Sequence, residues 1–344
     1  MKVQMKVFLS ENLGLFCKNK KIFLYTVTLI YDKVLYKRGV CILQEVNIIM
    51  KKKIKNQCGR RGEKIFSNAC IVPSLVGVLI FFLIPFGIVV YYSLINNTIA
   101  KEFVQLDNYK ALMKNTAFIT ASKNTAFFSM IAVPLAVVIP LGLAVILERN
   151  IMGKSIFRTF FLSPLMVPTA SVVLVWQVIF HNHGTVNRII EKFGGTPVSW
   201  LESSHGMFVI ILMFLWKNIG YNMILFMSAL GGIPKDILEV AELEGASRAY
   251  QFFHIKLRYL SPTILFVLIL SLINSFKIFR EIYLLIGDYP VDRLYMLQHF
   301  MNNTFNSLDY QKLSAAAVFF SLVMIVIIAV LLVSEHIFGK DVEN

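Results

Sequence analysis

The chain has 344 residues, of which 57% are hydrophobic and only 16% carry a charged side chain. Soluble domains contain about 25% charged residues, so this composition excludes an ordinary soluble protein and indicates a membrane protein. The formal net charge of +14 is compatible with a nucleic-acid partner, but no motif of a nucleic-acid-binding domain accompanies it. We therefore expect no nucleic acid among the partners.

The distribution of the charged residues along the chain is more informative than the net charge. Residues 1–64 contain 15 Lys or Arg and 4 Asp or Glu, whereas the rest of the chain contains 19 and 16. Cytoplasmic segments of membrane proteins are rich in Lys and Arg. Residues 50–68 are therefore predicted to form a basic cytoplasmic N-terminal segment in a bacterial cell membrane protein.

Residues 1–49 suggest a question about the start of translation. Met50 is followed by Lys51–Lys53, as at the start of many bacterial membrane proteins, and Gln44-Glu45-Val46 can be encoded by codons containing the ribosome-binding sequence AGGAGGT. We hypothesise that residues 1–49 are a mis-assigned upstream extension; the alternative is a disordered or membrane-surface tail. A peptide from before Met50 in the native protein, found by mass spectrometry, would contradict the hypothesis.

Six apolar stretches are long enough to cross the hydrocarbon core of a bilayer, which takes about 20 residues. We predict an all-α, polytopic protein with six transmembrane helices between residues 69 and 340, and with both termini in the cytoplasm. Prolines in the first three stretches predict bent helices, either around a pathway or as plain packing kinks. The stretches are approximately 69–94, 125–147, 159–180, 206–230, 260–286 and 313–335.

The cysteines and histidines give no metal or disulfide pattern. Cys17, Cys41, Cys58 and Cys70 all lie outside the predicted external loops, and their spacing matches no metal-binding motif. His181, His183 and His205 lie in or near one external loop without a nearby acid or cysteine. We expect no metal, cofactor or catalytic residue in this chain.

A polar segment, residues 231–260, separates the fourth and fifth stretches. Pro234 suits the first turn of a helix, and Asp236 and Glu239 would lie near the positive end of its dipole. Gly245 can stop that helix at positive φ, and Ser247 can cap a second one. From physical chemistry alone, the segment is either a solvated linker or a docking element for a partner.

Several motifs resemble the permease subunits of carbohydrate-type binding-protein-dependent ABC importers, over roughly residues 66–340. The segment Glu239-Val240-Ala241, Glu244-Gly245-Ala246 and later Ile255 and Leu257 is similar to the cytoplasmic loop signature of that family. Further similar stretches are Phe103–Tyr109, Phe157–Pro164, Gly184 with Asn187, Trp200-Leu201 and Trp216–Asn222. The sequence departs from the family pattern at Val240, Glu244, Arg258 and Gly287–Pro290, and Arg258 in place of Pro predicts a longer second helix.

The resemblance implies a transport subunit that is not an enzyme. The chain has no phosphate-binding loop of the Walker type, so ATP would be hydrolysed by a separate ABC ATPase subunit docked on a cytoplasmic coupling helix. The other implied partners are a second permease subunit, with a heterodimer favoured, an extracellular solute-binding protein and the lipid bilayer. The residues implied in coupling are Glu239, Ala241, Glu244, Gly245, Ala246, Ile255 and Leu257.

The expected solute is a sugar or oligosaccharide, with glycerol 3-phosphate as an alternative. Charged groups within membrane spans are functional candidates, and sugars are commonly held by aromatic and amide side chains. The same side chains also serve in packing. The candidates for the pathway are Trp216, Lys217, Asn218, Tyr221, Asn222, Asn274 and Phe276.

Two other classes stay open on the sequence. An ion-coupled secondary transporter typically has internal repeats and an intramembrane carboxylate, for which only Glu281 near a membrane boundary is a candidate. A membrane enzyme needs a paired catalytic set within the spans, and the sequence offers none.

Overall fold

The computed structural model describes residues 71–97, 101–148, 153–203 and 205–339. Within them the chain is helical, and its one strand-like contact is an isolated bridge between Ile95 and Phe103. The all-α prediction is therefore confirmed. The predictions for residues 1–49 and 50–68, and the four cysteines, lie outside the described residues.

Among the described residues, five helices are long and apolar enough to cross a membrane, and a sixth span results if one bent pair of helices is counted as one. The chain divides into two units after Leu83; Leu79–Leu83, at the end of the first unit, is a π-helical part of the first span. The single spans are Ile71–Ser93, Thr116–Glu148, Gly206–Leu230, Ser261–Ile286 and Tyr310–His336, and the bent pair is Lys154–Met166 with Thr169–Ile179.

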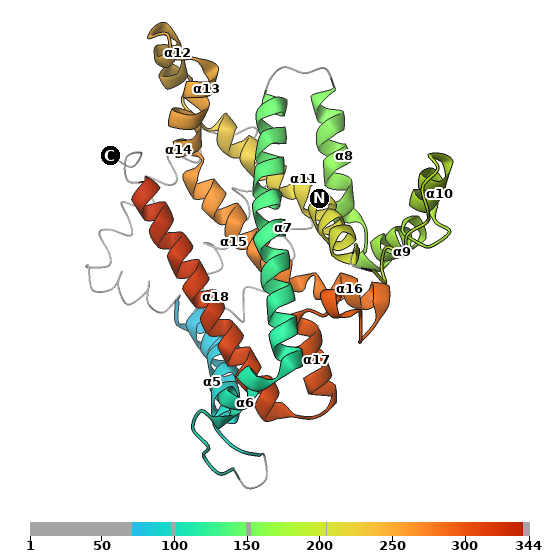
Figure 1. Ribbon diagram of the computed structural model, residues 1–344. Helices are drawn as coiled ribbons and strands as arrows, with labels where there is room; N and C mark the ends of the chain where they lie inside the picture. The colour runs from blue at the N-terminus through green and yellow to red at the C-terminus, as the bar shows by residue number, and fades with distance from the viewer. Residues whose placement is uncertain (1–70, 98–100, 149–152, 204, 340–344) are drawn as a thin grey trace, which may run out of the picture. The chain divides into compact units, whose positions relative to one another are not determined.

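The elements of the second unit are labelled in Figure 1 where there is room. They are α5 (Ile84–Ser93), α6 (Asp107–Lys114), α7 (Thr116–Glu148), α8 (Lys154–Met166), α9 (Thr169–Ile179), α10 (Thr185–Lys192), α11 (Gly206–Gly231), α12 (Lys235–Leu243), α13 (Arg248–Tyr250), η3 (Gln251–Lys256), α14 (Leu257–Tyr259), α15 (Ser261–Lys277), α16 (Phe279–Ile286), η4 (Asp292–Leu294), α17 (Leu297–Asn306) and α18 (Tyr310–Gly339).

The third span is broken where the sequence predicted one stretch, 159–180. The chain bends by 102° between α8 and α9. The break between the two helices is the dipeptide Val167-Pro168. The ring of a proline pushes the preceding residue away from helical angles, and Val167 is accordingly extended, with φ −89° and ψ 130°. Pro168 is extended as well and directly precedes α9.

Helix α7 is the central column of the second unit (Figure 1). Its first turns, at Phe118, pack with α6, α17 and α18 in one hydrophobic cluster. Its middle, at Phe128, packs with α9, α11 and α16 in a second, and its last turns, at Ala144, pack with the end of α11 and the start of α15 in a third. Pro134 and Pro140 lie inside α7 without ending it.

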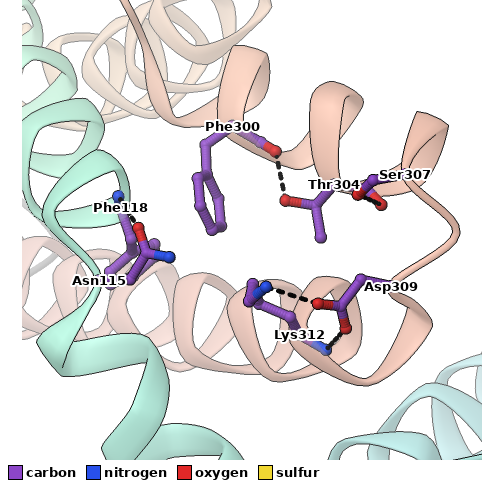
Figure 2. Close-up of polar contacts among 7 residues, drawn as sticks. All are labelled: Asn115, Phe118, Phe300, Thr304, Ser307, Asp309 and Lys312. Atoms are coloured by element: carbon purple, nitrogen blue, oxygen red, sulfur yellow. Dashed lines mark hydrogen bonds and ion pairs between the residues drawn. The ribbon is translucent and has the colours of Figure 1, made fainter.

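The end of the unit at which α7 begins is fixed by capping side chains (Figure 2). Asn115 accepts a hydrogen bond from the backbone N–H of Phe118 at 3.0 Å, and Asp309 accepts one from Lys312 at 3.1 Å. Both bonds satisfy an N–H group that the first turn of a helix leaves without a partner. At the end of α17, the Ser307 hydroxyl donates to the Thr304 carbonyl at 2.9 Å, one of the carbonyl groups that the last turn of a helix leaves without a partner.

Large apolar side chains remain exposed along the outer faces of the spans, as expected of helices that contact lipid. Examples are Met130 on α7, Phe160 on α8, Val178 on α9 and Val330 on α18. The length, apolar composition and exposed faces of these helices indicate a multi-pass membrane protein.

Candidate functional site

The segment between α11 and α15 begins with α12, which ends in a Schellman motif. The N–H of Ala246 bonds to the Ala241 carbonyl at 2.9 Å, and the N–H of Gly245 bonds to the Glu242 carbonyl at 3.0 Å. Gly245 has φ +82°, a region that glycine enters without steric cost. The predicted helix stop is therefore confirmed, whereas Pro234 directly precedes α12 instead of lying in its first turn.

The second half of the segment is a continuous helical run from Arg248 to Tyr259, with a π-helical stretch, η3, in its middle. Ser247 caps it, since its hydroxyl accepts the Tyr250 N–H at 3.2 Å. The backbone stays helical through Arg258 to Leu260. This agrees with the longer second helix predicted from Arg258 in place of Pro.

The segment exposes apolar side chains that a solvated linker would bury or replace. Leu243 is 87% exposed, Phe253 63% and Val240 56%. The predicted coupling residues divide by exposure. Glu239, Glu244 and Gly245 are exposed, whereas Ala241, Ala246, Ile255 and Leu257 are partly buried.

Two kinds of contact hold the segment to the spans. Leu238 and Tyr259 pack against the cluster formed by the last turns of α7 and α11. Lys256 donates to both carboxylate oxygens of Glu148, at 2.8 and 2.7 Å. Glu148 is the last residue of α7, so the segment is joined directly to the central column. Glu148 was not among the residues predicted from the sequence. Its one local signal is its charge, because an acid near the negative end of a helix dipole is unfavourable unless a cation offsets it.

The asparagines among the predicted pathway residues on α11 and α15 hydrogen-bond to neighbouring helices. Asn274 donates to the Asn218 side chain at 2.9 Å. Asn222 donates to the Ala136 carbonyl at 2.7 Å and to the Ser271 hydroxyl at 3.1 Å. Asn222 is buried, while Asn218 and Asn274 are partly exposed.

Lys217 forms an ion pair with Glu281 of α16, and its ammonium group also lies 3.4 Å from the Thr169 hydroxyl at the start of α9. Glu281 is 5% exposed, and among the described residues its Oε2 has no hydrogen-bond partner. The pair therefore joins α11, α16 and the second half of the broken span. Sequence analysis singled out both residues but did not pair them, because they lie 64 positions apart.

The aromatic pathway candidates differ in surroundings. Trp216 and Tyr221 are exposed on α11. Phe276 lines a pocket of about 100 Å³ together with Thr125 and Ser275, and it packs edge-on against Phe320 at 4.7 Å between ring centroids.

The loop between α9 and α11 is organised by the buried side chain of Asn187. Its amide donates to the Asn182 and Val198 carbonyls, both at 2.9 Å. Its oxygen accepts the Val198 N–H at 3.1 Å and the Trp200 indole N–H at 2.9 Å. Gly184 is confined as well, since a Cβ there would lie 2.4 Å from the Val178 carbonyl oxygen. These residues match the stretches quoted above for the family resemblance.

Apolar spans around a central helix, one of them broken, with a polar helical segment exposed between two of them, indicate a multi-span membrane protein with a partner-facing element. A family model described as "Binding-protein-dependent transport system inner membrane component" matches residues 136–344. The chain belongs to this family, and it is the membrane-embedded component of a binding-protein-dependent transport system.

Relatives agree with this assignment. The arabinooligosaccharides transport system permease protein AraP of Bacillus subtilis is 32% identical, over 78% of this chain and 87% of the relative. The trehalose/maltose transport system permease protein MalF of Thermococcus litoralis is 30% identical, over 72% and 86%. The sn-glycerol-3-phosphate transport system permease protein UgpA of Pectobacterium atrosepticum is 28% identical, over 60% and 71%.

The fold is also similar to that of a solved transporter chain. A chain in the crystal structure of a bacterial ABC transporter involved in the import of the acidic polysaccharide alginate matches with a TM-score of 0.69 at 20% identity, covering 83% of this chain and 98% of that chain. The predicted permease fold is thus confirmed.

Proposed function

We propose that this chain is the permease subunit of an ATP-driven importer for a sugar or oligosaccharide, and that residues 231–260 receive the movement of a separate ABC ATPase. The observation that carries the proposal is the exposed apolar set Val240, Leu243 and Phe253 on a short capped helical segment. Apolar side chains exposed on a polar element are typical of a protein-docking surface.

Within this docking surface we assign the roles as follows. Glu239 and Glu244 make polar contacts to the ATPase, and Gly245 sets the turn between the two helical halves, with Ala241 and Ala246 packed beside it. Ile255 and Leu257 are apolar anchors, and both are partly buried against their own chain. Closure of the ATPase would displace the segment as a unit and open the pathway alternately to the two sides.

The other partners are proposed together with this docking. We assign the cytoplasm to the side of residues 231–260, where Lys256 pairs with Glu148 of α7. Both termini are expected there, because an even number of spans returns the chain to the side on which it started. The solute-binding protein would contact loops 95–124, 181–205 and 287–312. A second permease subunit would complete the pathway, and a heterodimer is favoured.

The proposed solute class rests on the named solutes of relatives and on the side chains of α11 and α15. Two of the relatives above carry names of oligosaccharide or disaccharide transport. Trp216 and Tyr221 offer exposed aromatic faces, and Asn218 and Asn274 offer amides. Lys217, Asn222 and Phe276 complete the proposed lining. Sites for small polar ligands combine aromatic walls with a few placed polar groups.

The test of coupling is solute uptake by the assembled transporter carrying Gly245→Asp or Glu239→Lys. We expect both variants to insert into the membrane but to lose uptake and to lose the ATPase on purification. An L-residue at φ +82° costs about 1–2 kcal/mol, and Gly153→Asp is the matched control, because Gly153 has φ +81° with an equally open surrounding outside the segment. Normal uptake by both segment variants would overturn the proposal.

The solute class is tested separately with the intact transporter. Uptake of labelled disaccharides and oligosaccharides is compared with uptake of glycerol 3-phosphate, the solute named for the third relative. Saturable uptake of a sugar supports the proposal, and uptake of glycerol 3-phosphate alone contradicts it.

A further inference from the structure

Lys256 and Glu148 form a bidentate contact between the segment 231–260 and the end of α7. The ammonium nitrogen lies 2.8 Å from Oε1 and 2.7 Å from Oε2, and both side chains are partly buried. Lys154, which starts α8, lies 3.5 Å from the backbone carbonyl of Glu148. The side chain of Glu148 is thus held by the segment.

The location of Glu148 is electrostatically unfavourable without this partner. It is the last residue of α7 that the structure describes, and the carbonyl end of a helix dipole repels a carboxylate nearby. Lys256 offsets that repulsion from an element 108 residues further along the chain. The contact with Lys256 therefore accounts for an acidic residue near the carbonyl end of α7.

Movement of Glu148 would reach the pathway through α7 itself. Ser129 of α7 hydrogen-bonds to Ser275 of α15 at 2.9 Å, and the Ala136 carbonyl accepts from Asn222 of α11. α7 stays one continuous helix in spite of Pro134 and Pro140, and energetic coupling between distant sites is carried by packed helices and hydrogen bonds of this kind.

We propose that the Lys256–Glu148 pair is the strut through which the segment moves α7, so that the two residues position the span and set how much solute is moved for each ATP hydrolysed. This inference rests on the proposed docking of an ATPase on the segment. Lys256 and Glu148 act through α7, and neither needs to touch the solute or the nucleotide.

The test uses the complete transporter in liposomes and measures the ratio of solute transported to ATP hydrolysed. We expect Glu148→Gln and Lys256→Met each to lower that ratio by about tenfold, within the 5–150-fold range of coupling between linked sites, while the ATPase remains bound and active. The exchange Glu148→Lys with Lys256→Glu restores the contact and is expected to recover the ratio. Lys154→Met is the matched control and should leave it unchanged.

The outcomes separate the strut from the proposed function. Single variants that keep the normal ratio, or that lower thermal stability without changing it, overturn the strut. If they keep the ratio while Gly245→Asp abolishes uptake, only the strut fails. If Gly245→Asp also transports normally, the proposed docking segment itself fails.

Discussion

Gly220 of α11 and Phe161 of α8 touch backbone to backbone. A Cβ placed on Gly220 would lie 1.8 Å from the Phe161 carbonyl oxygen and 2.5 Å from its carbon. No side-chain rotation relieves that overlap, so the two helices can cross here only while residue 220 is glycine.

Gly220→Ala is therefore expected to destabilise the protein by about 3 kcal/mol, the upper part of the range for overpacked interiors. The measurement is thermal unfolding in detergent together with the amount of protein in the membrane. Gly142→Ala in α7 is the control, because nothing lies within 4 Å of its Cβ position, and alanine in a helix gains about 0.5–1 kcal/mol over glycine. Equal unfolding temperatures for the two variants would contradict the close crossing.

Removal of the Lys217 charge should leave the Glu281 carboxylate buried without its cation. Breaking a buried pair costs about 3–5 kcal/mol, and we expect Lys217→Met to fall at the lower end because the Lys217 side chain is 27% exposed. Adding Glu281→Met should recover most of that loss. Unfolding free energies of the two single variants and the double variant give the interaction directly.

The control for that cycle is Lys312→Met. Lys312 pairs with Asp309 at 2.5 Å, and both side chains are more than a third exposed, so the expected loss is below about 1 kcal/mol. A loss of the same size at Lys217 and Lys312 would show that burial does not strengthen the Lys217–Glu281 pair.

Asn187→Ala should loosen the loop between α9 and α11. The substitution leaves the Val198 N–H and the Trp200 indole N–H without their shared acceptor, at a cost of about 1–3 kcal/mol for each buried group that finds no water. We expect faster proteolysis of this loop and a red shift of Trp200 fluorescence. Asn182→Ala is the matched control, since Asn182 contributes its backbone carbonyl to the loop, and a similar change in both variants would contradict the role of Asn187.

The buried imidazole of His299 predicts sensitivity to acid. Burial lowers the pKa of His299 from 6.5 to about 4, and its Nδ1 accepts the backbone N–H of Met296 at 3.2 Å, which the protonated ring cannot do. The unfolded chain then binds the proton more readily than the folded one. Stability is complete above pH 6.5 and falls as the pH drops towards 4, by on the order of 2–3 kcal/mol.

The measurement is the unfolding temperature of the protein and of its His299→Gln variant between pH 8 and pH 4, because a pKa that differs between the folded and unfolded chain makes stability depend on pH. Glutamine can accept the same N–H without titrating, so its curve should lack the part of the acid loss that belongs to His299. Parallel curves would show that His299 does not contribute.

Local sequence determined the class of this protein and the form of residues 231–260. Apolar length predicts a membrane span because each span must satisfy its own backbone hydrogen bonds. The stop at Gly245 and the cap at Ser247 were predictable for a similar reason, because each depends on bonds made within a few residues. The break at Val167-Pro168 was signalled by the proline, although its angle of 102° was not.

Tertiary structure alone decided which distant residues meet. Hydropathy and helix period give the faces of a helix but not its partner or register, so the pairs Lys217–Glu281 and Lys256–Glu148 could not be read from spacing. The same holds for Gly220, whose necessity arises from the Phe161 backbone of another helix. These contacts depend on how whole helices cross, and that is set by the sum of many packing interactions along the chain.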